Sequence, residues 1–118
     1  MITSQELIQY KNTDDMEELK LMLKNDSIAY EAWFPLAEKY AKEMANGKPL
    51  LMDVIVNKHV NAIESSAWRI ARRYQKQFGR YLECDQYQRM AISWQWFYNL
   101  MMDAYTFFAN RKNGGQVI

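Results

Sequence analysis

The sequence predicts an all-α protein, a compact bundle of about four to six helices in a single domain over residues 1–118. Four glycines and two prolines leave few of the turns that a many-stranded β protein needs. Apolar residues recur at helical spacing along most of the chain. They make up 49% of the composition against 25% charged residues, which is typical of a folded domain and unlike a disordered chain.

Two short helices are expected at the N-terminal end. Thr3 and Glu6 have the spacing of a capping box, which predicts a helix from Thr3 to about Lys11. Thr13 or Asp14 is expected to cap a second helix, from Met16 to about Lys24. Its inward-facing residues are predicted to be Leu19, Met22 and Leu23.

A longer helical pattern begins at Ile28, after a turn and cap at residues 25–27. Pro35 lies inside this pattern, and a proline removes one intrahelical hydrogen bond and disfavours helix at the residue before it. The sequence therefore predicts a break or kink at Phe34 and a helix from Pro35 to Asn46, ended by Gly47. The buried side of this helix is expected to consist of Leu36, Tyr40 and Met44.

The second half of the chain predicts a long antiparallel helix pair. One helix spans about residues 50–78 and the other about 86–110, capped by Asp85, and a loop of about seven residues keeps them neighbours. Residues 111–115 are expected to form a frayed tail. The predicted inward-facing residues are Ile63, Ala67, Ile70, Tyr74, Phe78 and Tyr81 on the first helix, and Tyr87, Met90, Trp94, Phe97, Met101, Tyr105 and Phe108 on the second.

A stripe of basic residues runs along the first helix of this pair. Arg69, Arg73, Lys76 and Arg80 recur at i, i+4, i+7 and i+11, so a helix places them on one side. The chain from residue 54 onward carries nine basic and four acidic residues, whereas residues 1–53 carry six and ten. The stripe is either a solvated face or a contact surface for an acidic partner. If it is a contact surface, charge reversal at Arg73 and Lys76 should abolish binding and leave stability nearly unchanged.

The last helix has more large apolar side chains than one buried side accommodates. Trp94, Met101 and Phe108 are expected in the core, whereas Trp96 falls outside their stripe. Trp96 must then be covered by the N-terminal helices or by a second molecule, so it is a candidate partner-binding residue and an oligomer is an open alternative.

The sequence contains no recognisable catalytic or metal-binding constellation, and we expect no enzymatic activity and no cofactor. The single cysteine, Cys84, has acidic neighbours that disfavour a reactive thiolate, and the single histidine, His59, is expected to be a surface or hydrogen-bonded histidine and not a catalytic base. A lone cysteine suits a reducing compartment, and the N-terminus does not have the pattern of a secretory signal. The apolar window from Ala91 to Ala109 contains Asp103, which disfavours a membrane span. We therefore expect a cytoplasmic protein with no membrane partner.

One segment resembles region 2 of bacterial sigma factors. It comprises Ile70-Ala71-Arg72-Arg73-Tyr74, preceded by residues 56–60 and followed by Leu82-Glu83-Cys84-Asp85-Gln86-Tyr87-Gln88. The layout is similar to that of the short late-gene sigma factors of tailed phages. The resemblance implies an all-α fold whose two helices grip the clamp helices of RNA polymerase, with Arg72, Arg73, Asp85 and Gln88 as contacting residues. The sequence departs from the family at Tyr87, where an aliphatic residue is usual, and at Arg89, where glutamate is usual.

The leading functional hypothesis is a non-enzymatic protein of the transcription apparatus that binds RNA polymerase, like sigma region 2 without the promoter-reading helices. The first alternative is a small phage-encoded anti-defence inhibitor that binds and occludes a host nucleoprotein complex. The second is a small helical nucleic-acid-binding module. In all three, the candidate partner-binding residues are Arg69, Arg72, Arg73, Lys76, Arg80, Asp85, Gln88 and Trp96.

Overall fold

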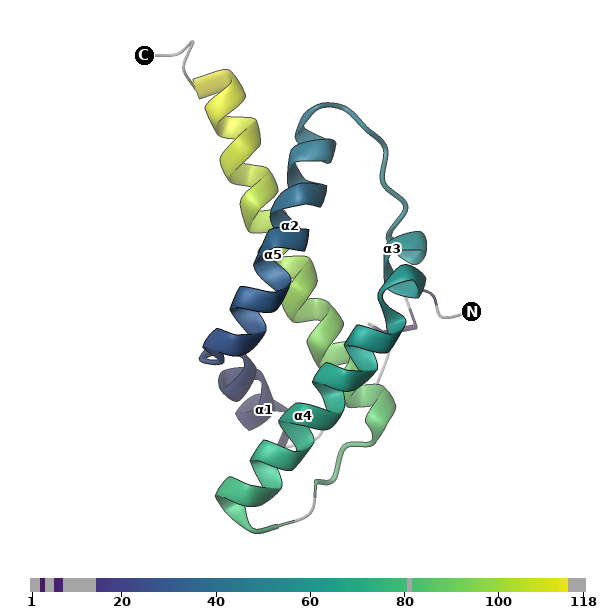
Figure 1. Cartoon of the computed structure of the whole chain (residues 1–118), viewed down its shortest axis with the longest axis vertical. Helices are drawn as coiled ribbons and strands as arrows, with labels where there is room; N and C mark the ends of the chain where they lie inside the picture. Colours follow the sequence, from purple (N-terminus) through teal and green to yellow (C-terminus); the bar gives the residue numbers. More distant parts are fainter. Residues whose placement is uncertain (1–2, 4–5, 8–14, 81, 115–118) are drawn as a thin grey trace.

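Figure 1 shows the computed structural model, which describes residues 3, 6–7, 15–80 and 82–114, the last three of these by their backbone alone. The described residues form helices and no strand, which confirms the all-α prediction. The helices are α1 (Asp15–Lys24), α2 (Ser27–Ala45), α3 (Met52–Lys58), α4 (Val60–Phe78) and α5 (Gln86–Gly114). The capping box and short helix predicted from Thr3 to Lys11, and the cap at Thr13 or Asp14, lie mostly outside the described residues.

α5 is the helix on which α1, α2 and α4 pack. α2 contacts it most extensively, and α4 and α1 contact it as well. In Figure 1, α4 descends toward the loop at residues 79–85 and α5 rises from that loop, so the predicted pair is present, with α2 as an additional and larger neighbour. The reason is that the first half of α5 buries several sides at once. Its buried residues include Met90, Ala91, Ile92, Ser93, Trp94 and Phe97.

The second half of α5 is less buried than its sequence predicts. Met101 is in the core as expected, but Tyr105 and Phe108 are only partly buried, and Lys42 Nζ lies 5.4 Å from the centre of the Phe108 ring. Figure 1 shows this yellow end of α5 extending past α2. Tyr87, at the other end, is exposed and donates its hydroxyl to Glu6 Oε2 at 3.0 Å. The predicted frayed tail is helical as far as Gly114.

α2 is one continuous helix from Ser27 to Ala45, so the predicted break at Phe34 and the predicted helix start at Pro35 are both wrong, while the alternative of a kink stays a prediction. A single stripe on both sides of the proline is buried, and its residues are Ala29, Trp33, Ala37, Tyr40 and Ala41. Leu36 and Met44, which were expected in that stripe, pack only at its border. Packing on α5 therefore outweighs the missing hydrogen bond at Pro35, because the buried stripe needs both halves of α2 in line.

The predicted helix over residues 50–78 is two helices, because the chain turns at His59 between α3 and α4. The imidazole Nε2 of His59 lies 2.8 Å from the hydroxyl of Tyr40 on α2, a hydrogen bond between residues 19 apart in the chain. Ile55 and Val56 of α3 are buried. The contact that holds this turn comes from α2, which is distant in the chain. The local sequence therefore does not predict the turn, since neither a glycine nor a proline lies near His59.

The helix ends follow the predicted caps. Asp26 caps α2 by accepting from the backbone N–H groups of Ile28 and Ala29, and Gly79 ends α4 in the left-handed conformation with φ 65°. Of the inward-facing residues predicted on α4, Ile63, Ala67, Ile70 and Tyr74 are buried. Phe78 is exposed instead, and Tyr81 lies outside the described residues. On α1, Leu19 and Leu23 are buried, with Met16 in place of Met22.

Candidate functional site

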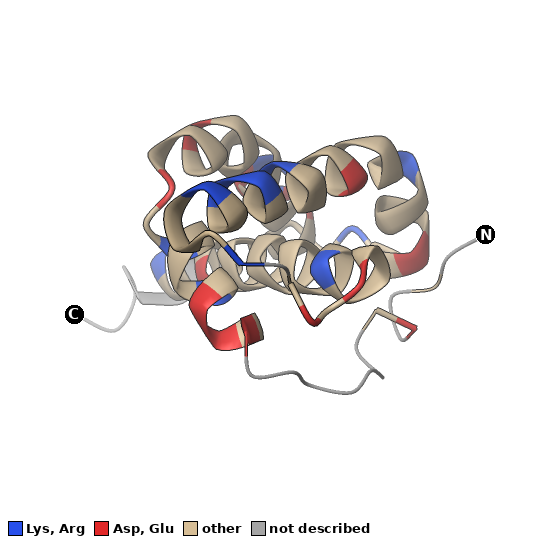
Figure 2. Cartoon of the chain, turned by 90° about the horizontal axis from the view of Figure 1, so that it is seen from below, with Lys and Arg blue, Asp and Glu red and all other residues tan. Residues whose placement is uncertain are grey.

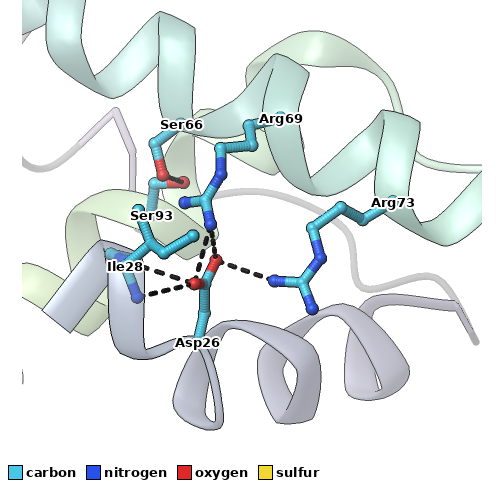
Figure 3. A network of polar contacts seen from close by, with 7 residues as sticks. Asp26, Ile28, Ser66, Arg69, Arg73 and Ser93 are labelled. Atoms are coloured by element: carbon cyan, nitrogen blue, oxygen red, sulfur yellow. Dashed lines mark hydrogen bonds and ion pairs between the residues drawn. The ribbon is translucent and has the colours of Figure 1, made fainter.

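Two arginines of the predicted basic stripe reach back into the protein and bind one buried carboxylate. Arg69 Nη2 lies 2.7 Å from each carboxylate oxygen of Asp26, and Arg73 Nη1 lies 2.9 Å from Oδ2 (Figure 3). Asp26 is 4% exposed and uses its Oδ1 atom to cap α2 as well. These contacts connect the start of α2 to α4. Beside them, the buried hydroxyls of Ser66 and Ser93 lie 3.2 Å apart and connect α4 to α5.

The surroundings of Asp26 favour its charged form. Burial raises the pKa of this carboxyl group, but the hydrogen bonds from Arg69 and from the N–H of Ala29, with the charges of Arg69 and Arg73, outweigh burial and lower it. Asp26 is therefore a carboxylate whose negative charge offsets part of the charge of two arginines.

Arg80, the last residue of the predicted stripe, lies beyond the end of α4 at Phe78 and not on the helix as predicted, and it is also paired. Arg80 Nη2 lies 2.9 Å and 3.1 Å from the two carboxylate oxygens of Glu18 on α1, and Arg80 Nε donates to the Tyr74 hydroxyl at 3.0 Å. The stripe is thus not a row of free cations. Among the basic residues of α4, Arg72 and Lys76 form no ion pair with any described residue, and both are exposed.

An open groove of about 430 Å³ lies on the outer side of α4. Its lining residues are Ser65, Trp68, Arg69, Arg72 and Arg73, a set that we call the α4 face. Trp68 is 51% exposed, and the guanidinium carbon of Arg89 lies 5.8 Å from the centre of its ring. Figure 2 shows the basic residues following one another along α4 in the upper part of the view, while the acidic first turn of α1 lies below.

The sequence prediction did not include Trp68 among the candidate site residues, although a signal for it exists. Residues 65, 68, 69, 72, 73 and 76 follow the helical series i, i+3, i+4, i+7, i+8 and i+11. A tryptophan inside a cationic series cannot belong to the buried stripe on the other side of the same helix. Its exposure was therefore predictable from spacing alone.

The first turn of α5 borders the α4 face. Gln86 Nε2 donates to the backbone carbonyl of Glu64 at 3.2 Å. The side chain of Arg89 is buried and donates to the Cys84 carbonyl and to Gln86 Oε1, so this arginine lies between Trp68 and the loop. Arg89 is one of the two residues at which the sequence departs from the sigma-factor pattern that it resembles, and in this structure its contacts are structural.

Asp85 and Gln88 form a capping box at the start of α5. Asp85 Oδ1 accepts from the N–H of Gln88 at 2.8 Å, and Gln88 Oε1 accepts from the N–H of Asp85 at 2.8 Å. The prediction that Asp85 caps α5 is confirmed. Both residues thus have a structural role that explains their spacing without a partner.

Trp96 lies apart from the α4 face, beside a cavity of about 200 Å³ between α1 and α5 that Leu23, Ile92 and Asn99 help to line. It is partly buried and packs against the core, so α1 supplies part of the cover that the sequence required. The structure therefore places the candidate residues in separate positions. Arg69, Arg72 and Arg73 are together on the α4 face, Asp85 and Gln88 are at the adjacent end of α5, and Trp96 is on another side.

No group of three or more histidine, cysteine or carboxylate side chains is close enough to hold a metal ion in the part of the chain that the structure describes. Among the same residues, no helix combines the length and the apolar character that crossing a bilayer requires. No protein-family model, no curated protein and no solved structure matches the chain.

Proposed function

We propose that this protein is a non-enzymatic binding protein that docks its α4 face on an acidic surface of a protein partner. The observation that carries the proposal is an exposed tryptophan, Trp68, in an arginine-lined groove. Tryptophan and arginine are the residue types most enriched among those that dominate binding energy at protein interfaces. An exposed Trp68 has no role in the core that would account for it.

The balance of charges favours a protein partner over nucleic acid. Asp26 lies against Arg69 and Arg73, which leaves Arg72 and Lys76 as the cations of α4 that no described carboxylate neutralises. The whole chain carries a net charge of +1. Proteins that hold a nucleic-acid backbone usually present a more extensive basic surface than this. A mixed groove of one indole and a few cations fits a protein interface of ordinary composition.

The sigma-factor resemblance supplies a specific partner for this proposal, bacterial RNA polymerase. In sigma region 2, two consecutive helices grip the clamp helices of the polymerase, and α4 and α5 are the corresponding helices here. The border between the α4 face and the first turn of α5 supports this version, because Arg89 of α5 contacts the ring of Trp68 and Gln86 contacts the backbone of Glu64 on α4.

The test is the affinity of the immobilised protein for purified core RNA polymerase, measured by biolayer interferometry. We expect the double substitution of Arg72→Glu, in the α4 face, and Lys76→Glu, the next cation along the same side of α4, to weaken binding at least about tenfold. Charged contacts at an interface are worth about 2 kcal/mol or more. Arg73 is excluded from this test because its reversal would face the buried Asp26 and alter stability. Arg111→Glu, at the distant end of α5, is the matched control. If the protein does not bind the polymerase, RNA polymerase is not its partner. If the double variant binds as tightly as the wild type, the α4 face is not the contact surface.

Nucleic acid is the second candidate ligand, because an exposed indole next to arginines also stacks single-stranded bases. The two candidates differ in salt dependence. An affinity for a single-stranded oligonucleotide that falls steeply and linearly with the logarithm of salt concentration, and that requires Trp68, would favour nucleic acid over a protein.

A further inference from the structure

A second groove, of about 360 Å³, lies between α2 and α3, and it shares no residue with the α4 face. Leu50, Leu51, Val54 and Ile55 form its apolar part. Leu51 is 69% exposed and Val54 is 60% exposed, although both belong to the turn and helix whose other side is buried through Ile55 and Val56. The start of α3 therefore presents two adjacent apolar side chains to solvent, next to the exposed charged residues Asp53 and Lys58.

Lysines surround this apolar surface. Lys39 on α2 and Lys58 on α3 line the groove and form no ion pair with any described residue. The third, Lys48, lies 3.7 Å from Glu43, the carboxylate among the lining residues. The groove consequently carries an excess of about two positive charges around an apolar centre.

Both unpaired lysines are close enough to influence His59, which turns the chain from α3 into α4. Burial lowers the pKa of this imidazole, and the charges of Lys58 and Lys39 lower it further. The positive charges of Lys39 and Lys58 therefore act on the imidazole itself.

We propose that the groove between α2 and α3 binds an acidic amphipathic segment of a partner protein. The segment places apolar side chains on Leu51 and Val54 and carboxylates beside Lys39 and Lys58. Charge complementarity favours this occupant, since an apolar centre with unpaired lysines on both walls matches a helix or strand with alternating acidic and apolar faces. A lipid surface is a poorer match, because the apolar residues lie in a concave groove that also contains Glu43.

The experiment uses a synthetic amphipathic peptide of glutamate and leucine, with a scrambled peptide of the same composition as its control. Binding is followed by two-dimensional NMR of the full chain. The imidazole resonance of His59 is an internal reporter, because this is the single histidine in the sequence. Carboxylates beside Lys39 and Lys58 should raise the apparent pKa of His59, because they offset the lysine charges that lower it. The amide signals of Leu51 and Val54 should shift in a saturable way.

Two variants locate the site. Lys58→Glu and Val54→Asp change exposed side chains, so both should stay folded by circular dichroism, and each should weaken peptide binding at least about fivefold. Lys24→Glu, a charge reversal on α1, should leave peptide binding unchanged, and all three variants should keep the affinity of the α4 face for its own partner. Equal binding of the scrambled peptide, binding of anionic vesicles in place of the peptide, or a dimer in sedimentation that buries Val54 would each overturn the proposal.

Discussion

Asp26 has several structural roles at once. Its carboxylate caps α2 and binds Arg69 and Arg73 from α4, while the residue itself is nearly inaccessible to solvent. Helical spacing correctly predicted that the arginines share one side of α4. It did not predict their carboxylate, because Arg69 and Asp26 are 43 residues apart and no local pattern connects them.

Asp26→Ala should lower the free energy of unfolding by about 2–4 kcal/mol. The substitution removes a helix cap, worth about 1 kcal/mol. It also removes the buried carboxylate that forms ion pairs with both Arg69 and Arg73. Chemical denaturation followed by circular dichroism measures the change. Ser27→Ala is the control, since Ser27 is exposed and adjacent, and its substitution should cost less than about 0.5 kcal/mol. A small effect at Asp26 would mean that the ion pairs contribute little.

The same residue predicts an acid dependence of stability. The pKa of Asp26 is lowered in the folded protein, so its contribution is complete above the unfolded value, near 4, and is lost as the pH falls through the folded value. The difference in melting temperature between the wild type and Asp26→Asn should therefore be constant from pH 7 to about 5 and should shrink below pH 4. A difference that persists unchanged at pH 2.5 would contradict this assignment.

At the scale of single helices, the sequence predicted which segments are helical and which residues cap them better than it predicted where a helix continues or ends. Asp26, Gly79 and Asp85 act through their nearest neighbours, so their capping roles were accessible. Pro35 and His59 show the opposite case. Local chemistry predicts a break at Pro35 and none at His59, but packing on α5 keeps α2 whole, and the hydrogen bond from Tyr40 holds the turn before α4.

Pro35→Ala should therefore stabilise the protein. An alanine restores the backbone N–H donor to the carbonyl of the preceding turn and removes a ring that crowds this carbonyl. It also makes the unfolded chain more flexible, which opposes part of the gain. The net increase in the free energy of unfolding should be about 1–2 kcal/mol. Pro35 is exposed, so the core is unaffected. A higher midpoint of urea denaturation with an unchanged slope is the expected result. A lower midpoint would indicate that α2 needs the proline for its path along α5.

At the scale of the whole molecule, α5 organises the fold, and its length and apolar character were visible in the sequence. Its neighbours were only partly predictable. The short loop after α4 required α4 and α5 to be adjacent, whereas the larger contact with α2 depends on how surfaces distant in the chain match. For the same reason, the sequence could place Arg69, Arg72 and Arg73 on one helix, but it could not show that Trp96 lies on a different side of the molecule.

The two tryptophans of α5 distinguish its core side from its border. Trp94 is fully buried, and Trp94→Ala should cost about 3–5 kcal/mol, enough to unfold a domain of marginal stability. Trp96 packs at the edge beside α1, and Trp96→Ala should cost about 1–2 kcal/mol and leave the protein folded at 25 °C. Thermal melts of both variants make the comparison. Equal losses would show that α1 encloses Trp96 completely.

The central claim, that the α4 face is the docking surface, is tested most directly by site-specific photo-crosslinking. A benzoylphenylalanine replaces Trp68 in one variant and Phe107, which is 56% exposed near the far end of α5, in a second. Each variant is irradiated with purified core RNA polymerase, and the crosslinked peptides are identified by mass spectrometry. We predict a crosslink from position 68 to an acidic segment of the polymerase clamp and none from position 107. Equal crosslinking from both positions, or crosslinking from position 107 alone, would contradict the account.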